Sequence, residues 1–220
     1  MTAPSAWPPG KLPDTAPARA PEGTGARARL LDAAAALIIE RQSIEISLAD
    51  IAAKAALNSA LVKYYFGGKT GLLVALVERD AVHAAASMQE LLRRNLPAGQ
   101  KMRLHVRAIM TTYRRSPYLN RLLHALLHGP EEAVRTTVYD LLVQPVFACQ
   151  RAILQEGVAS GEFRPVDLRL FYLSVVGACD QFLQTDNVLL LAQDGIDPEI
   201  FKDRYIAHVV DMVMSALTPN

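Results

Sequence analysis

The stretch that decides the fold is SLADIAAKAALNSALVKYYFGGKTGLL, residues 47–73. The Ser47 side chain can accept a hydrogen bond from the first turn of a helix, and Asp50, three residues on, supplies the acidic half of a capping box. A helix is therefore predicted to begin near Leu48. Its apolar residues recur at the spacing of one buried helical face, at Leu48, Ile51, Ala52 and Ala55.

A second short helix is predicted directly after the first. Asn58 or Ser59 can cap it, and Ala56 and Leu57 are left as the turn. Its packed side is predicted to hold Leu61, Val62 and Tyr65. Two helices of about two turns each bury little surface between themselves, so they need a third helix as support. This arrangement is a helix-turn-helix whose second helix is presented to solvent.

Long helical segments flank the pair on both sides. Residues 25–41 place Leu30, Ala33, Ala34, Leu37 and Ile38 on one side at helical spacing, which supplies the third helix. Residues 69–95 form a long helix that begins beside the second helix of the pair. Its far end is expected in another part of the molecule, so it can act as a lever.

The remainder of the chain is also predicted to be helical. Turn and capping residues divide it into helices over residues 100–115, 116–129, 130–160, 167–184 and 197–217, with a kink before Pro145. Ser116 and Pro117 are interpreted as a cap and first-turn pair. No convincing strand is found, so the fold class is all-α with about nine helices. Residues 1–23 hold six prolines without periodicity, which predicts a disordered arm.

Composition gives limited guidance about function. The formal net charge is +1, and residues 27–69 hold six basic against four acidic residues, a weak basic bias. Two cysteines, Cys149 and Cys179, are too few for a disulfide framework or a closed metal site. No segment reaches the about 18 uninterrupted apolar residues of a membrane span, so we expect a cytoplasmic protein without a membrane partner.

No catalytic constellation is present in the sequence. His124 and His128 stand four residues apart on one helical face, a spacing that can chelate a metal. The glutamate of a metalloprotease HExxH motif is missing between them, and no third ligand is evident. We therefore expect no metal, no cofactor and no enzymatic activity, and an all-helical enzyme is the disfavoured interpretation.

The stretch at residues 47–73, together with the upstream segment ARARLLDAAAALIIERQSIEIS, resembles the N-terminal DNA-binding domain of TetR/AcrR-type bacterial transcriptional repressors. The shared order is an R-x-x-x-L-x-A-A-x-x-L helix, an slxdIAxxAgv helix, a recognition helix that closes on aromatics, and a lysine before paired leucines. The resemblance covers residues 27–78. The matching positions are Arg29, Ala33, Ala34, Leu37, Leu48, Asp50, Ile51, Ala52, Ala55, Tyr64, Tyr65, Phe66, Lys69, Leu72 and Leu73.

Two positions depart from the family pattern. Ala56 stands where the family usually has a glycine, so it either accepts a left-handed conformation at a cost of about 1 kcal/mol or alters the turn. Lys63 stands where the recognition helix often carries a phosphate-contacting tyrosine. A lysine there can still contact phosphate as a point charge.

Composition and the resemblance together predict three parts: the disordered arm at residues 1–23, a DNA-binding domain at 24–68, and a helical effector-binding and dimerisation domain at 69–220 that begins with a connecting helix at 69–95. It also implies a double-stranded DNA operator as partner. Asn58, Ser59, Ala60 and Lys63 are expected to face the major groove. The full set of predicted DNA-binding residues is Ser47, Asn58, Ser59, Ala60, Lys63, Tyr64 and Lys69.

The effector site is predicted among the helices at residues 100–184, which are apolar with scattered polar groups. We expect a mainly hydrophobic organic molecule there, aromatic or acyl-chain-like. Asp180 and Gln181 interrupt an apolar helix, either as polar groups of this pocket or as paired buried groups at an interface. The predicted ligand-binding residues are Arg107, Thr111, Tyr113, Gln150, Tyr172 and Gln181.

The last two helices carry apolar residues on more than one face, and such helices must be covered on all sides. A second copy of the chain is the simplest cover and would give a four-helix contact about a two-fold axis. Central helices of a monomer core are the alternative. The predicted interface residues are Phe171, Gly177, Ala178, Phe201, Tyr205, Val209 and Val213.

These observations favour a ligand-responsive DNA-binding transcriptional regulator. It would be a repressor that binds a pseudo-palindromic operator as a homodimer and is released by a small hydrophobic effector. The alternative is a DNA-binding protein without a small-molecule effector that acts architecturally or through a protein partner. The effect of a small molecule on operator affinity distinguishes the two.

Overall fold

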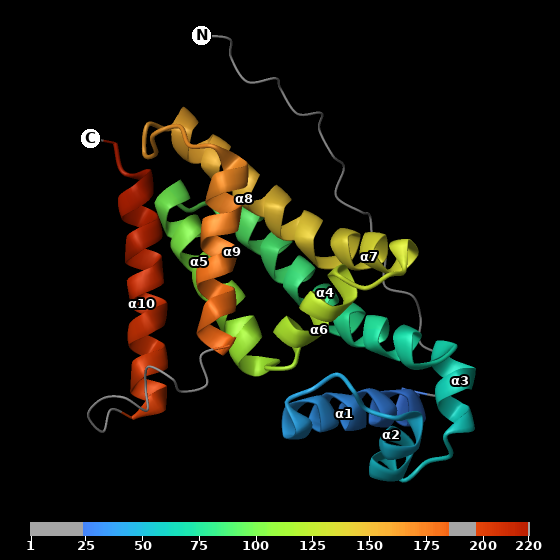
Figure 1. Cartoon of the computed structure of the whole chain (residues 1–220). Helices are drawn as coiled ribbons and strands as arrows, with labels where there is room; N and C mark the ends of the chain where they lie inside the picture. Colours follow the sequence, from blue (N-terminus) through green and yellow to red (C-terminus); the bar gives the residue numbers. More distant parts are fainter. Residues whose placement is uncertain (1–23, 185–196, 220) are drawn as a thin grey trace.

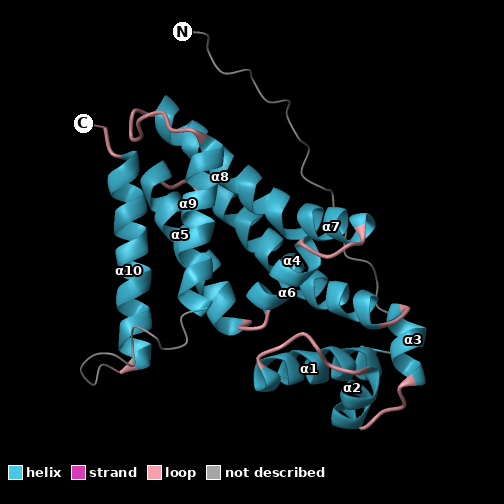
Figure 2. Ribbon diagram, viewed as in Figure 1, coloured by secondary structure: helices cyan, strands magenta, loops and turns pink. Residues whose placement is uncertain are grey.

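The structure of the chain is a computed structural model that describes residues 24–184 and 197–219. The predicted arm at residues 1–23 therefore lies outside the described residues. Within them all regular structure is helical, and no residue lies in a strand (Figure 2). The elements are α1 (Thr24–Arg41), α2 (Leu48–Ala55), α3 (Ala60–Phe66), α4 (Lys69–Arg93), α5 (Ala98–Arg115), α6 (Leu119–Leu127), α7 (Glu132–Val138), a π-helix (Tyr139–Val143), α8 (Gln144–Ala159), α9 (Leu168–Gln184) and α10 (Pro198–Leu217).

The predicted all-α class is confirmed. Because α7, the π-helix and α8 follow one another without a break, these elements make nine continuous helical segments in the described part of the chain. The π-helix ends directly before Gln144 and Pro145, where the sequence predicts a kink. A proline in a helix lacks the N–H for the regular ladder, so an irregular turn beside it is expected.

Helices α1–α3 form a small unit at one end of the molecule, and α4 leads from it into a larger bundle built of α5–α10 (Figure 1). The predicted capping box starts α2: Ser47 Oγ accepts from the backbone N–H of Asp50 at 3.0 Å, and Asp50 Oδ2 accepts from the backbone N–H of Ser47 at 3.3 Å. The Arg41 guanidinium also donates to Asp50 at 2.8 Å. These hydrogen bonds, that from Arg41 above all, hold the pKa of Asp50 well below its usual range.

The turn after α2 is made without glycine. Ala56 takes the left-handed conformation, with φ 50° and ψ 49°, and the N–H of Leu57 donates to the carbonyl of Ala52 at 2.9 Å. The sequence leaves open either a left-handed conformation at Ala56 or an altered turn, and the structure has the left-handed conformation. The Arg29 guanidinium donates to the carbonyls of Ala55 and Ala56, so it also satisfies the end of α2.

The turn between α3 and α4 depends on closely placed glycines. Gly67 ends α3 in the left-handed conformation at φ 71°, and Gly68 at φ 143° precedes α4. At Gly71 an added Cβ would lie 1.8 Å from the backbone oxygen of Phe66. The end of the second short helix and the start of the long one are thus in direct backbone contact.

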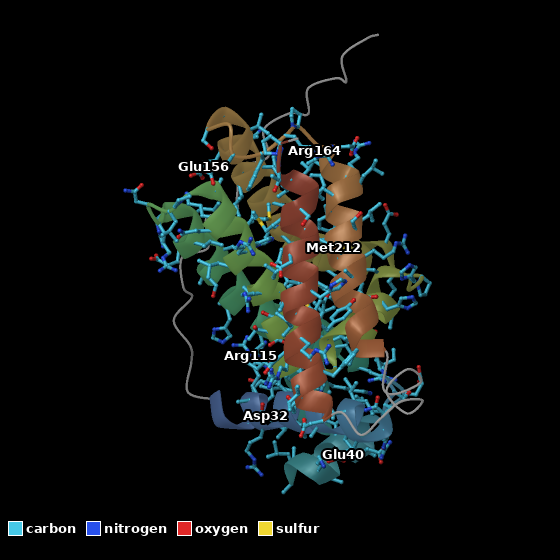
Figure 3. The ribbon with its side chains drawn as sticks, turned by 90° about the vertical axis from the view of Figure 1, so that its left-hand side faces the viewer. Asp32, Glu40, Arg115, Glu156, Arg164 and Met212 are labelled. Atoms are coloured by element: carbon cyan, nitrogen blue, oxygen red, sulfur yellow. The ribbon has the colours of Figure 1, made fainter. Side chains whose placement is uncertain are left out.

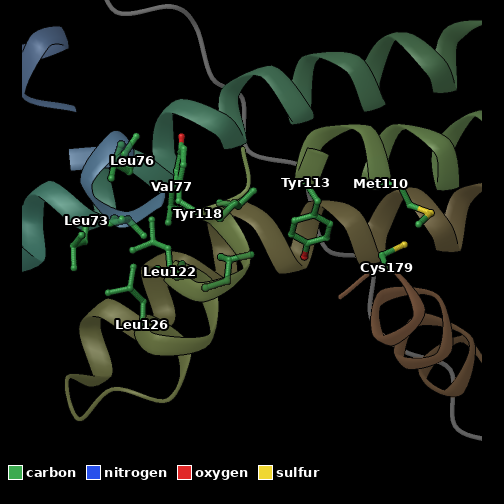
Figure 4. Close-up of a cluster of buried hydrophobic side chains, with 14 of the residues drawn as sticks. Leu73, Leu76, Val77, Met110, Tyr113, Tyr118, Leu122, Leu126 and Cys179 are labelled. Carbon is green, nitrogen blue, oxygen red and sulfur yellow. The ribbon is translucent and has the colours of Figure 1, made fainter. Parts of the chain in front are cut away.

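The core of the bundle is formed around the first half of α4. In Figure 4 the side chains of Leu73, Leu76 and Val77 gather with those of Leu122 and Leu126 from α6, and all five are buried. The predicted cap for this region is wrong in its detail, because Ser116 Oγ does not cap α6. It donates instead to Asp80 Oδ1 on α4 at 3.0 Å, and α6 begins at Leu119.

Helices α9 and α10 run side by side on one face of the molecule, with exposed Met212 on α10 (Figure 3). Each begins at an aspartate: Asp167 Oδ1 accepts from the N–H of Leu170 at 3.0 Å, and Asp197 Oδ1 accepts from the N–H of Glu199 at 2.7 Å. Within the described ranges no single helix is long and apolar enough to cross a membrane. The one pair that reaches this length together, α3 and α4, is bent by 57°.

Candidate DNA-binding face, effector cavity and dimer face

Helix α3 divides into a packed side and an exposed side. Val62 is buried, and Leu61 and Tyr65 pack against the core, as their spacing predicts. The predicted DNA-binding residues Asn58, Ser59, Ala60 and Lys63 are all exposed, and Tyr64 is 79% exposed. Asn58 rather than Ser59 supplies the cap, since its Oδ1 accepts from the N–H of Ala60 at 2.8 Å while Ser59 makes no side-chain cap.

The basic side chains around α3 differ in what they contact. Lys69 Nζ lies 3.3 Å from Glu45, and Lys54 Nζ lies 2.7 Å from Glu40. Lys63 makes no ion pair within the described residues, so its charge is available for a phosphate. Ser47 is exposed at the start of α2, where its hydroxyl oxygen already accepts the capping hydrogen bond.

A polar network connects α1 with the junction of α5 and α6. The Arg79 guanidinium on α4 donates to Asp32 on α1 at 2.7 Å and to the hydroxyl of Tyr118 at 2.9 Å. The Tyr118 hydroxyl in turn donates to buried Asp80 at 2.7 Å. A displacement of Tyr118 would therefore reach α1 through only one intervening side chain.

A cavity of about 610 Å³ lies among α4, α5, α6, the π-helix, α8 and α9. It falls within the range of small-molecule sites, and its wall is mainly apolar. The apolar lining consists of Ala84, Met88, Leu91, Leu104, Ala108, Ile109, Leu119, Leu123, Leu127, Leu142, Val143, Val146, Leu173 and Val176.

The predicted ligand-binding residues fall into three groups. Arg107, Thr111, Tyr113 and Tyr172 all line the cavity. Gln150 does not line it, which corrects the prediction: its side chain is fully buried, and both amide atoms lack a hydrogen-bond partner in the described part of the chain. The side chain of Gln181 lies outside the described residues.

Several polar residues of the wall were missed from the sequence: His83 and Ser87 from α4, Arg115 from α5, His124 from α6, and His128, which directly follows α6. The two histidines near the end of α6 are stacked, with ring centroids 4.4 Å apart, and the described residues hold no group of three or more metal-ligating side chains around them. Their spacing of four residues predicts that the two side chains lie on one face of the helix. It does not predict that this face lines a cavity.

The buried part of the cavity wall is uncharged. Burial lowers the pKa of His105 to about 4, so its imidazole is neutral at pH 7, and its Nδ1 lies 3.5 Å from the thiol of Cys149. Burial also raises the pKa of Tyr172 to about 12 and that of Tyr113 further. Asp180 lines the cavity and accepts a hydrogen bond from Asn120, so it is both a wall residue and a paired group.

The predicted dimer residues differ in accessibility. Val209 and Val213 are 1% and 5% exposed, and Phe171 is also buried, so these three pack within the subunit. Phe201, Tyr205 and Ala178 are half-buried, and the Tyr205 hydroxyl donates to the carbonyl of Ala178 at 2.9 Å. Gly177 is exposed, and a Cβ added there would meet open space.

Helices α9 and α10 also expose large aliphatic side chains. Leu170 and Leu173 are 66% and 65% exposed on the same helix as Gly177, and Ile200 and Met212 are exposed on α10. Such side chains left open on two neighbouring helices are a feature of surfaces that bind another protein.

Comparison with known proteins agrees with this architecture. Residues 30–76 match the family described as bacterial regulatory proteins, tetR family, and residues 95–220 match the family described as tetracyclin repressor-like, C-terminal domain. The chain belongs to the TetR family of transcriptional regulators, which are DNA-binding proteins. No curated protein matches the sequence significantly.

Solved structures show the same fold at low sequence identity. The TetR family regulator PfmR from Thermus thermophilus has a TM-score of 0.69 and 21% identity, covering 88% of this chain and 98% of PfmR. A putative fatty acid metabolism regulator from Clostridium perfringens has a TM-score of 0.68 and 12% identity, covering 87% and 100%. FadR from Bacillus subtilis, in complex with stearoyl-CoA, has a TM-score of 0.66 and 20% identity, covering 86% and 98%.

Proposed function

We propose that the protein is a homodimeric repressor that leaves its operator when a small hydrophobic effector fills the cavity. The observation that carries this proposal is the position of α4. Its first turn contacts the end of α3 at Gly71, and its second half lines the cavity with His83, Ser87 and Leu91. One helix is therefore in contact with both the recognition helix and the ligand space.

The DNA-facing part of the proposal concerns α3. Its exposed residues enter the major groove, with Ser59 contacting a base and Lys63 a phosphate. Lys63→Ala should weaken binding similarly for all DNA sequences and reduce the slope of log affinity against log salt concentration by about one. Lys54→Ala is the control, because Lys54 already pairs with Glu40. An unchanged salt slope for Lys63→Ala would remove this residue from the interface.

The dimeric part of the proposal concerns α9 and α10. Two DNA-binding units, each formed by α1–α3 of one subunit and related by a two-fold axis, require operator half-sites about 34–36 Å apart or a multiple of this distance. Gly177→Arg tests the interface, since an added side chain there meets open space; because Gly177 also lines the cavity, effector binding is measured on the same variant. Val209→Arg would instead place a charge in the subunit core and unfold it. If Gly177→Arg remains dimeric by light scattering, the interface lies elsewhere.

The effector is proposed to be acyl-chain-like. The aliphatic wall of the cavity supports this choice, as does the likeness in fold to a regulator crystallised with stearoyl-CoA. The bound effector would shift the tilt of α4 and thereby the separation of the two DNA-binding units. The effector can weaken operator affinity only as much as it prefers the conformation whose DNA-binding units do not match the half-site spacing. Each tenfold preference for that conformation corresponds to about 1.4 kcal/mol of operator binding free energy.

The decisive experiment measures effector affinity with and without operator DNA. Coupling free energy between two sites is reciprocal, so saturating operator must weaken effector binding by the factor by which the effector weakens operator binding. An effector that binds the free protein and the operator complex equally well would contradict release. The effector-free mode of DNA binding would then be favoured.

A further inference from the structure

Helix α5 carries an unusual set of charges. Its sequence, AGQKMRLHVRAIMTTYRR, contains five lysine or arginine residues and no acidic residue. Three of the five are ion-paired with other helices. Lys101 pairs with Glu156 at 2.8 Å, Arg103 with Asp211 at 3.1 Å, and Arg114 with Glu199 and Asp203 at 2.7 Å and 2.9 Å.

The other two cations of α5 are Arg107 and Arg115, and both line the cavity. Neither makes an ion pair or a side-chain hydrogen bond within the residues that the structure describes, although Arg114 beside Arg115 makes two ion pairs. The two arginines are eight residues apart, which corresponds to about 12 Å along the helix axis. Thr111 lies between them on the same side.

The rest of the cavity rim holds three histidines. His83, His124 and His128 are exposed lining residues. Among the described lining residues the one carboxylate is Asp180, and it accepts a hydrogen bond from Asn120. The cavity thus combines an aliphatic, uncharged interior with a rim that holds two arginines and three histidines.

We propose that the cavity selects an amphiphile with an aliphatic tail and an anionic headgroup, and that Arg107 and Arg115 bind the headgroup. An arginine guanidinium binds a carboxylate or phosphate through two parallel hydrogen bonds, and such charge-assisted bonds are about twice as strong as neutral ones. A cationic amphiphile would place like charges together, so it is rejected by the same residues. This inference rests on the proposed effector cavity and adds the charge of the effector.

The number of anionic groups separates two sources of such an amphiphile. A free fatty acid offers one carboxylate, which a single guanidinium binds through both oxygens, so it would depend chiefly on one arginine. An acyl thioester of coenzyme A carries several phosphates on an extended headgroup, so it would engage both.

The experiment measures calorimetric binding of C10 probes to the full-length protein without DNA. The probes are decanoate, decanoyl-CoA, decanol and decylammonium. At least one anion should bind roughly tenfold or more tightly than decanol, since a hydrogen bond to a charged group contributes this order of affinity, and decylammonium should bind weakest.

Variants identify the residues that hold the headgroup. At least one of Arg107→Gln and Arg115→Gln is expected to lower affinity for the preferred anion roughly tenfold while leaving decanol binding unchanged. Arg103→Gln and Arg114→Gln are matched controls on the same helix, because the first removes one ion pair and the second removes two, and neither residue lines the cavity. A loss from one cavity variant alone points to a carboxylate, and losses from both point to the thioester.

The inference is overturned if neither anion binds, if decanol binds as tightly as the anions, or if the control variants lose as much affinity as the cavity variants. Operator release is measured separately with the same probes. An anion that binds through Arg107 or Arg115 and leaves operator affinity unchanged supports the assignment of the site and contradicts the proposed release mechanism.

Discussion

The two ends of α4 lie in differently built surroundings. Near the N-terminal end of α4 lies α2, whose backbone groups are hydrogen-bonded at both of its ends. The capping box of Ser47 and Asp50 satisfies the first turn of α2, and the Arg29 guanidinium donates to the carbonyls at its last turn. At its C-terminal end, α4 borders a cavity of about 610 Å³ and a bundle that contains a π-helix. The buried side-chain atoms without hydrogen-bond partners in the described residues belong to His105 and Gln150, both in this second region.

This difference shows where a ligand can act. A close-packed unit transmits a displacement as a rigid body, whereas a region with a void and unpaired polar groups can rearrange when a molecule fills it. In the proposed mechanism the unit formed by α1–α3 moves as a body and the cavity region rearranges. Gly71 and the Arg79–Tyr118 network connect the two, so they would determine how far a change at the cavity reaches the DNA.

The most damaging change is expected at the contact between the two regions. Gly71→Ala places a methyl group 1.8 Å from the backbone oxygen of Phe66, so the end of α3 and the start of α4 must separate. Overpacking costs about 1–3 kcal/mol and more where backbone has to move. We expect a loss of several kcal/mol in the free energy of unfolding, measured by urea denaturation, together with a loss of operator binding.

Gly177→Ala is the matched control for this substitution. A Cβ there meets open space, and alanine is favoured over glycine inside a helix by about 1 kcal/mol. The control should therefore be as stable as the wild type or more stable. Equal stabilities for the two variants would show that α3 and α4 are not held in close contact.

The second prediction concerns acid stability of the cavity region. Burial depresses the pKa of His105 from its usual 6.5 to about 4, so the unfolded chain binds this proton at a higher pH than the folded chain. The stabilisation from the neutral imidazole is complete above pH 6.5 and is lost as the pH falls toward 4. The free energy of unfolding should decrease by about 1.4 kcal/mol per pH unit within this window.

The variant His105→Gln separates this effect from other titrations. The thiol of Cys149, which contacts His105, has its pKa raised by burial to about 12 and stays protonated throughout. Carboxylates with depressed pKa, such as Asp50, lose their contribution only as the pH falls below about 4. The slope between pH 6.5 and 4 should thus be much smaller in His105→Gln. An unchanged slope would assign the effect to another group.

The same two regions differ in what their sequences reveal. The capping box of α2 joins residues three positions apart, Ser47 and Asp50, so spacing alone predicts it, whereas the contact of Arg29 with the end of α2 is long-range. The polar contacts that join different helices of the bundle are also long-range. Ser116 looks like a helix cap locally, yet its hydroxyl donates to Asp80, 36 residues away, and Glu162 accepts from the N–H of Gly99 across 63 residues.

The cavity wall was predictable only in part for the same reason. Arg107 and Thr111 were predicted as polar groups in an apolar domain, and they line the cavity, but so do His83 and Arg115, which no local pattern distinguishes from surface residues. Gln150 satisfies the same criterion and is fully buried away from the wall. Which side of α8 or α10 faces a neighbour depends on packing angles, and periodicity does not contain them.

The third prediction tests the connection between the regions. Tyr118→Phe removes the hydroxyl that accepts from Arg79 and donates to Asp80, while Ser116 still donates to Asp80. We expect a loss of about 1–3 kcal/mol in stability from the lost hydrogen bonds. Effector and operator should each still bind, but the factor by which one weakens the other should fall.

Tyr205→Phe is the control, because the Tyr205 hydroxyl joins α10 to α9 by donating to the carbonyl of Ala178, away from the Arg79–Tyr118 network. It should leave the coupling factor unchanged. A coupling factor that is equally reduced in both variants, or in neither, would exclude the Arg79–Tyr118 network as the path of communication.

The smallest effect is expected within the DNA-binding unit itself, at Ala56. This residue holds φ 50° without being glycine, and the left-handed conformation costs a residue with a Cβ about 1 kcal/mol. Ala56→Gly removes that strain, but it also raises the conformational entropy of the unfolded chain, which lowers the free energy of unfolding by about 0.4–1 kcal/mol. The net gain should be a few tenths of a kcal/mol.

Gln42 is the comparison, since it has φ 51° and its side chain donates to the carbonyl of Ile39 at 3.0 Å. Gln42→Gly loses that hydrogen bond as well, so it should be the less stable of the two variants by urea denaturation. A lower stability for Ala56→Gly than for Gln42→Gly would mean that the turn after α2 is not strained, and the alanine there would then be as suitable as the glycine of the family pattern.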